Sequence, residues 1–236
     1  MARILMIVSA AGRLRLADGT DHPTGFWAEE VAESHRVLTE AGHRVDVATP
    51  EGRQPVADPV SFDERGGVDP VAGAKYRAYL DALDDLAAPL KLADATVDGY
   101  DALYLPGGHG PMADLATDPA LGRLLVAADD AGKLVAALCH GVAGLLAARR
   151  DDGTFAFAGR VMTSFSDDEE RQGGLGERTP FFVEARLREQ GAAVTPGAPW
   201  SSTVVAEANL VTGQNPQSSV DTAARVARLL DSGSIS

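Results

Sequence analysis

Short apolar runs that end near glycine or proline alternate along this chain with longer segments of helical periodicity. The clearest runs cover residues 3–9, 45–49, 101–105 and the stretch between Gly132 and His140. A short, continuously apolar run is typical of a strand that is buried on both faces, as the strands of a parallel sheet are. The alternation therefore predicts an α/β fold, in which helices cover both faces of a mostly parallel sheet.

The segments between these runs set the expected element boundaries. Thr24 is suited to be the N-cap of a first helix over 25–41, and Gly42 to be its stop. Residues 51–75 are polar, with glycine and proline throughout, and we expect a loop there. The other expected elements are helices over 76–88, 119–131, 180–190 and 220–230, and strands over 160–163, 193–195, 203–206 and 210–212.

Length and charge bound the function. We find no internal repeat or linker, so we expect one domain over residues 1–236, with 51–98 as an elaboration on its core sheet. The formal net charge of −13 argues against nucleic acid or an anionic membrane as a partner. No apolar run approaches the roughly 20 residues that cross a bilayer, and the apolar start is too short for a signal-peptide core. A single cysteine cannot form an internal disulfide, so we expect a reducing, cytoplasmic location.

That cysteine, Cys139, stands where a strand is expected to turn into a helix, and His140 and Gly141 follow it. A sharp strand-to-helix turn can expose a nucleophile close to backbone N–H groups. Those N–H dipoles favour the thiolate, which is the reactive form of cysteine. A lone cysteine is more often a buried small hydrophobe, but the turn context favours a nucleophile here.

A second candidate position is the Pro-Gly-Gly-His-Gly turn over residues 106–110. Sites in doubly wound sheets gather at the carboxyl ends of strands, which would place this turn beside Cys139. Gly107 and Gly108 would let the backbone approach a ligand and aim N–H groups at an oxyanion, unless the turn serves packing alone. The glycine order is not a dinucleotide fingerprint and we find no Walker pattern, so we expect no cofactor.

Helical spacing separates Glu29 from Glu30. Glu29 shares a face with mostly charged positions such as Glu33 and Arg36, whereas Glu30 shares a face with Val37 and other residues that look buried. A carboxylate on an apolar face is costly unless paired, and its pKa rises. Glu30 is therefore the better candidate for a general acid and base. The alternative for either residue is an acid that favours the helix N-terminus.

The histidines divide by position. His140 follows the candidate nucleophile and could orient the thiolate or carry protons near neutral pH, or could be a polar residue of the first helical turn. We expect His109 to be a satisfied loop residue, as we do the three remaining histidines. The histidines and Cys139 match no metal-ligand spacing, so we expect no metal.

Several segments together resemble the DJ-1/PfpI superfamily and, within it, the Hsp31-like group associated with glyoxalase III activity. They follow in family order across nearly the whole chain. The matching segments are 22–30 (HPTGFWAEE), 104–110 (YLPGGHG), 137–141 (ALCHG), 162–165 (MTSF) with Glu169 and Glu170, 199–200 (PW) and 210–216 (LVTGQNP). The chain departs from its relatives at Ser34, where they often have proline, and at Ser164, where they usually have glycine.

The resemblance implies a flavodoxin-like sandwich with Cys139 as the nucleophile on an elbow. It assigns His140 as the adjacent histidine and Glu30 as the helix-borne acid. The acid that partners the histidine falls on Glu170, with Glu169 and Asp168 left open as alternatives.

The oxyanion donors implied by the resemblance are the backbone N–H groups of Gly108 and His140, with Gly107 in the same substrate-binding turn. The implied activity is a cofactor-independent conversion of methylglyoxal and water to lactate, and the implied partners are a small reactive carbonyl and a second copy of the chain. The alternatives are a cysteine amidase or peptidase, a protein deglycase, a stress chaperone or a redox sensor. Glutamine amidotransferase chemistry is less favoured, because its elbow is usually G-x-C-x-G.

Overall fold

A seven-stranded sheet forms the centre of the computed structural model, which describes residues 1–173 and 175–233. The strand order is β10-β11-β7-β6-β1-β4-β5, and neighbours are parallel except for the β10–β11 pair. The strands are β1 (Arg3–Ile7), β4 (Arg44–Thr49), β5 (Leu90–Lys91), β6 (Ala102–Leu105), β7 (Leu134–Leu138), β10 (Val204–Glu207) and β11 (Leu210–Gly213). The predicted α/β fold with a mostly parallel sheet is confirmed.

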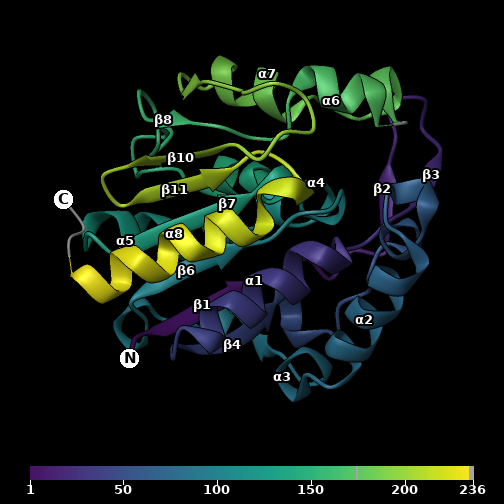
Figure 1. Cartoon of the computed structure of the whole chain (residues 1–236). Helices are drawn as coiled ribbons and strands as arrows, with labels where there is room; N and C mark the ends of the chain where they lie inside the picture. Colours follow the sequence, from purple (N-terminus) through teal and green to yellow (C-terminus); the bar gives the residue numbers. More distant parts are fainter. Residues whose placement is uncertain (174, 234–236) are drawn as a thin grey trace.

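Helices cover both faces of this sheet, as Figure 1 shows, with α1 and α8 on one face and α5 on the other. Side chains of β1 alternate between the two layers. Leu5 and Ile7 pack with the α5 side, whereas Ile4 and Met6 pack with the α1 and α8 side. Two separate hydrophobic layers therefore bury the sheet, which explains why its strands read as continuous apolar runs.

The remaining elements surround this sandwich. The helices are α1 (Ala28–Glu40), α2 (Pro70–Asp81), α3 (Asp84–Ala87), α4 (Gly110–Ala113), α5 (Pro119–Asp130), α6 (Asp167–Gln172), α7 (Val183–Glu189) and α8 (Ser219–Ser232). The 3₁₀ helices are η1 (Pro50–Gly52), η2 (Pro59–Phe62), η3 (Glu64–Gly66), η4 (Leu92–Asp94), η5 (Val97–Gly99), η6 (Leu115–Thr117), η7 (Cys139–Ala147), η8 (Gly176–Arg178) and η9 (Pro216–Ser218). Two small sheets pair β2 (Arg13–Arg15) with β3 (Asp21–Pro23) and β8 (Val161–Met162) with β9 (Ala193–Val194).

The first helix begins later than predicted, because the chain before it pairs with a distant segment. Phe26 donates its N–H to the Val56 carbonyl and accepts the N–H of Asp58. The hydroxyl of Thr24 donates to the Asp58 carboxylate at 3.1 Å and so does not cap the helix. The prediction of Thr24 as an N-cap was therefore wrong, and α1 begins at Ala28.

The expected loop over 51–75 and the helix over 76–88 also needed correction. Asp69 accepts the N–H groups of Val71 and Ala72, and Pro70 occupies the first helical position, so α2 begins inside the expected loop. The helix then breaks after Asp81, and α3 is a separate short helix.

Further differences lie in the loops and in the second half of the chain. The β2–β3 hairpin and α6 lie in segments for which we predicted no element. The segment after β7 is a 3₁₀ helix, η7, and α7 begins at Val183.

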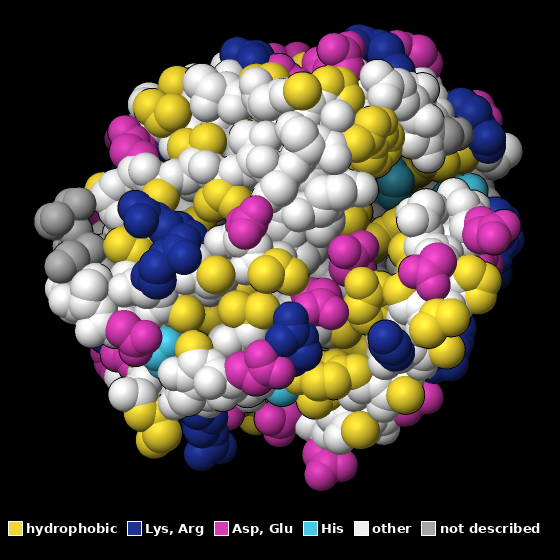
Figure 2. All heavy atoms as spheres, in the orientation of Figure 1, with side chains coloured by type: hydrophobic (Ala, Val, Ile, Leu, Met, Phe, Trp, Pro, Cys, Tyr) yellow, Lys and Arg dark blue, Asp and Glu magenta, His cyan; other side chains and the backbone are white. Residues whose placement is uncertain are grey.

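The distribution of charged side chains on the surface agrees with the acidic composition. On the face shown in Figure 2, lysine and arginine side chains stand in small groups among acidic ones, with no continuous basic stripe. Within the described ranges, no helix is both long and apolar enough to cross a bilayer.

Candidate active site

Cys139 lies at a sharp turn between β7 and η7. Its φ of 58° is in the left-handed region, which a residue with a Cβ rarely adopts. The loop that follows β6 packs against this turn with little side-chain material between them. A Cβ on Gly141 would lie 2.3 Å from the Leu105 carbonyl oxygen, and one on Gly107 would lie 2.8 Å from the His140 nitrogen. Both glycines are therefore required for this backbone-to-backbone contact.

Glu30 projects from α1 to the same place and is fully buried. Its Oε2 accepts the Gly107 N–H at 2.7 Å. Its Oε1 accepts no hydrogen bond within the described part of the chain, and the Cys139 thiol is close enough for the two groups to change each other's pKa. Burial raises the pKa of Glu30 to about 8, even though the contacts with Cys139 and Gly107 lower it. This carboxyl is therefore mostly protonated at neutral pH.

The neighbouring acid, Glu29, is less solvated than predicted. It is half-buried, and burial, followed by the charge of Glu33, raises its pKa to about 7. Helical spacing also places Phe26 on this face, but Phe26 lies before the first residue of α1 and is buried where its backbone pairs with Val56 and Asp58. The direction of the Glu30 side chain toward Cys139, rather than a raised pKa alone, distinguishes the two acids.

Among the three acids left open for His140, the structure pairs it with Glu170. Glu170 Oε2 lies 2.7 Å from His140 Nε2, and both side chains are buried. Glu169 instead accepts the Ser166 N–H and hydroxyl and the Trp200 N–H, and Asp168 is exposed and pairs with Arg171.

Proton positions around His140 follow from its partners. Burial raises the pKa of Glu170, but hydrogen bonds from His109 and His140 outweigh it and hold that pKa well below its usual range. An ionised carboxylate only accepts hydrogen bonds, so His140 Nε2 carries the proton. Burial, followed by the nearby His109, lowers the pKa of His140 to about 4, so the ring is neutral at pH 7. Its Nδ1 is then an acceptor, 3.4 Å from Cys139 Sγ.

The thiol itself is shielded. Cys139 is 3% exposed, and burial, followed by the Glu30 carboxyl, raises its pKa well above the ordinary value. The elbow therefore holds a neutral thiol with two proton-transfer groups beside it, and not a resident thiolate as the sequence suggested.

Comparisons with known proteins show the family of this chain. The sequence profile described as ThiJ/PfpI family-like matches residues 22–164, which include the glycine turn and the elbow. The chain belongs to the ThiJ/PfpI family. The resemblance to the DJ-1/PfpI superfamily is thereby confirmed.

Relatives of this ThiJ/PfpI protein carry different names. A bovine glutamine amidotransferase-like class 1 domain-containing protein 1 is 32% identical over 183 residues, covering 78% of this chain and 79% of the relative. Glyoxalase 3 from Candida albicans is 24% identical over 240 residues, covering 94% and 96%. A crystal structure of the Rapid Encystment Protein 24 KDa from Francisella tularensis aligns with a TM-score of 0.84 at 26% identity, covering 98% of this chain and 99% of that one.

The glycine turn of this ThiJ/PfpI protein supplies fewer oxyanion donors than expected. The Gly107 N–H donates to Glu30 Oε2, so in this structure it does not point to an oxyanion. The Gly108 N–H has no acceptor among the described residues, and its φ of 85° requires glycine. The His140 N–H faces the Cys139 sulfur. Gly108 and His140 thus remain as the candidate donors.

His109 is the site residue that sequence reasoning missed, because we expected a satisfied loop residue. Its Nε2 lies 3.3 Å from Glu170 Oε1, so Glu170 contacts two histidines. The donor atoms of these three side chains lie within 4.8 Å of one another, a spacing that could hold a metal ion. Each of them already has a partner inside the cluster, so no donor is left needing a metal.

Aromatic rings line up beside the elbow. The His140 ring lies 4.0 Å from that of His109 and 4.3 Å from that of Phe165. Trp200 stands edge-on to Phe165 at 5.7 Å, has a φ of 61° and is 39% exposed. Phe165 also packs on Cys139, so this row of rings forms one wall of the site.

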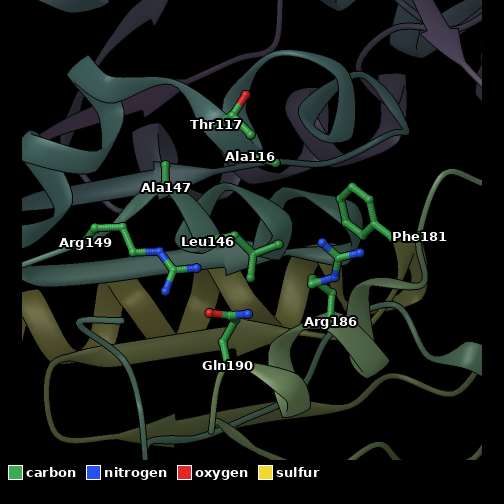
Figure 3. A pocket seen from close by; sticks show the side chains of 8 residues that line it. All are labelled: Ala116, Thr117, Leu146, Ala147, Arg149, Phe181, Arg186 and Gln190. Atoms are coloured by element: carbon green, nitrogen blue, oxygen red, sulfur yellow. The ribbon is translucent and has the colours of Figure 1, made fainter. Parts of the chain in front are cut away.

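Two surface cavities lie away from this site. The one in Figure 3 has a volume of about 310 Å³ and lies near the far end of η7, where Arg149 and Arg186 reach toward it from opposite sides. The other, of about 380 Å³, lies between β10 and α8. Neither is lined by Cys139, so the chemistry of the elbow and not cavity size locates the candidate active site.

Proposed function

We propose that this protein is a glyoxalase III-type enzyme, which converts methylglyoxal and water to lactate without a cofactor. The observation that carries the proposal is the fully buried Glu30 carboxyl, which is held by the Gly107 N–H, lies next to the Cys139 thiol and has its pKa raised by burial to about 8. A carboxyl whose pKa lies near the working pH can both give and take a proton. That property suits a proton shift between adjacent carbons better than it suits hydrolysis alone.

The first step forms a hemithioacetal. Cys139 Sγ bonds to the aldehyde carbon, its proton passes to His140 Nδ1, and Glu30 gives its proton to the aldehyde oxygen. The N–H groups of Gly108 and His140 would stabilise the charge that develops on that oxygen. Glu30 is then a carboxylate, and His140 is an imidazolium held by Glu170.

The second stage moves hydrogen between carbons. The Glu30 carboxylate removes the proton from the former aldehyde carbon, while His140 protonates the ketone oxygen, giving an enediol. Glu30 then protonates the second carbon and receives the proton of the remaining hydroxyl. The product is the lactate thioester of Cys139, and the oxidation of one carbon balances the reduction of the other.

Hydrolysis completes the cycle. His140 Nδ1 takes a proton from water as the water oxygen bonds to the thioester carbon, and the C–S bond breaks. The sulfur takes back the proton that His140 accepted from water, and lactic acid leaves as lactate and a proton, so the starting state is restored. Neither oxidant nor reductant is consumed.

A second candidate is hydrolysis of an amide or a glycation adduct by the same cysteine. The Cys139–His140–Glu170 arrangement favours it, since a nucleophile, a base and an orienting acid are the parts of acyl transfer. Relatives at 28% identity named protein/nucleic acid deglycase HchA also point that way. The elbow sequence Ala-Leu-Cys-His-Gly departs from G-x-C-x-G, which disfavours the amidotransferase reading suggested by the bovine name.

A lactate assay on three proteins tests the proposal. Wild type should form lactate from methylglyoxal, Cys139→Ala should form none, and Glu30→Gln should lose at least about a hundredfold in kcat. Glutamine and a glycated peptide serve as competing substrates. Full turnover by Cys139→Ala, or hydrolysis of a competing substrate without lactate formation, would overturn the glyoxalase assignment.

A further inference from the structure

His109 is built into the candidate site, although the proposed reaction gives it no task. Its Nε2 contacts Glu170 Oε1 at 3.3 Å, while His140 Nε2 contacts Oε2 of the same carboxylate at 2.7 Å. The two imidazole rings lie 4.0 Å apart, tilted by 40°. Two histidines, from the glycine turn and from the elbow, thus share one buried acid on α6.

We propose that His109 is a positioning residue: by holding the second oxygen of Glu170, it fixes the orientation and the tautomer of His140. The inference rests on the proposed function, in which His140 accepts a proton at Nδ1. It assigns to the glycine turn a task beyond the donation of N–H groups to an oxyanion.

The contact with His109 restricts the orientation of the Glu170 carboxylate. The terminal torsion angle of a glutamate has a broad distribution, so a carboxylate that is hydrogen-bonded at only one oxygen can still rotate about this bond. Bonding at both oxygens removes that freedom. The helix that carries Glu170 is only six residues long, which makes a second anchor on the side chain more important. A fixed carboxylate in turn fixes the ring of His140.

The same contact sets the tautomer of His140. While Glu170 is ionised, its oxygens accept hydrogen bonds from both Nε2–H groups, so His140 must present a bare Nδ1 to Cys139. If the His109 bond were lost, Glu170 would hold a proton more readily and the other tautomer of His140 would compete. With Nδ1 protonated, His140 could no longer accept the thiol proton.

His109 also affects the protonation of His140. The His109 ring lies 4.0 Å from that of His140, and His109 lowers the pKa of His140 after burial does. The groups that act on His140 from the packed elements are Cys139, His109, Glu169 and Glu170. The acidic members favour the imidazolium, and His109 opposes them. Without His109, therefore, His140 should titrate at higher pH.

Nitrogen-15 NMR of labelled histidines tests this directly, with His109→Ala, His109→Gln and the control His22→Gln on the β2–β3 hairpin. In wild type, His140 should be the Nε2–H tautomer and titrate at about pH 4. In His109→Ala, a mixture of tautomers should appear and the midpoint should rise by about one pH unit. His109→Gln, whose amide can donate to Oε1, should restore the tautomer.

The acid limb of lactate formation should move to higher pH with the NMR midpoint in His109→Ala and stay in place in the His22→Gln control. An unchanged tautomer and an unchanged midpoint in a folded His109→Ala protein would overturn the inference. The NMR result stands even if wild type makes no lactate. Failure of the proposed function is therefore distinguished from failure of the positioning role.

Discussion

The chemistry that Glu30 can perform depends on the direction in which its side chain points. Its neighbour Glu29 also has a raised pKa, because both acids lose water on α1. Of the two, only Glu30 combines complete burial with a backbone N–H on one oxygen and an interaction with the Cys139 thiol. A perturbed pKa therefore identifies both residues as unusual, while the contact with the thiol identifies the one that can do chemistry.

Glu30 should also give stability a pH dependence of known sign. Its folded pKa of about 8 exceeds the ordinary 4.5, so the stability that it contributes is complete below about pH 4.5 and is lost as the pH rises through 8. Glu30→Gln cannot ionise. Its free energy of unfolding should therefore gain on wild type by up to about 1.4 kcal/mol per pH unit between those values. Urea unfolding across this range measures it, with exposed Glu64→Gln as control; a constant difference would contradict the prediction.

At the scale of the element, α6 is a short helix that is held in place by hydrogen bonds at its N-terminus. Ser166 accepts the Glu169 N–H, and Glu169 accepts the Ser166 N–H, which is a complete capping box. The other oxygen of Glu169 accepts the Trp200 N–H and an amide proton of Asn215. This network sets the start of α6, and hence the position of Glu170.

Removing that cap should therefore cost activity as well as stability. Ser166→Ala and Asp118→Ala each remove an N-cap, on α6 and on α5, and each should lower the free energy of unfolding by about 1 kcal/mol. Only Ser166→Ala should lower kcat for lactate, by about tenfold, because only α6 carries a group of the site. Equal effects of the two variants on kcat would show that the cap does not position Glu170.

At the scale of the whole molecule, the site exists only because four segments meet at the carboxyl edge of the sheet. The segments are α1 with Glu30, the turn after β6 with His109, the elbow after β7 with Cys139, and α6 with Glu170. Doubly wound sheets place sites at this edge.

We expect this assembled site to work without a metal, because hydrogen bonds within the cluster already satisfy His109, His140 and Glu170. Dialysis against EDTA should leave the rate of lactate formation unchanged, and metal analysis of the active protein should find less than one equivalent of metal. Loss of activity that returns with a divalent metal would contradict this expectation.

The sequence predicted features that depend on local pattern and missed those that depend on distant contacts. Periodicity is enough to indicate the buried strands and the inward face of Glu30. The Thr24 hydroxyl donates to Asp58, which is 34 residues away, and His109 contacts Glu170, which is 61 residues away. Local spacing in the sequence does not indicate such pairs. The choice between Glu169 and Glu170 was within reach, since the Ser-x-x-Glu pattern uses Glu169 for capping and leaves Glu170 free.

The burial of the single thiol affects how readily this protein oxidises. A disulfide between two copies needs their sulfur atoms to come within about 2.05 Å of each other. Cys139 is 3% exposed and packs in a buried cluster with Leu138 and Phe165, so another chain cannot bring its own sulfur that close without opening the elbow. Preparations without reducing agent should therefore stay free of covalent dimers, and only a small oxidant should reach the sulfur.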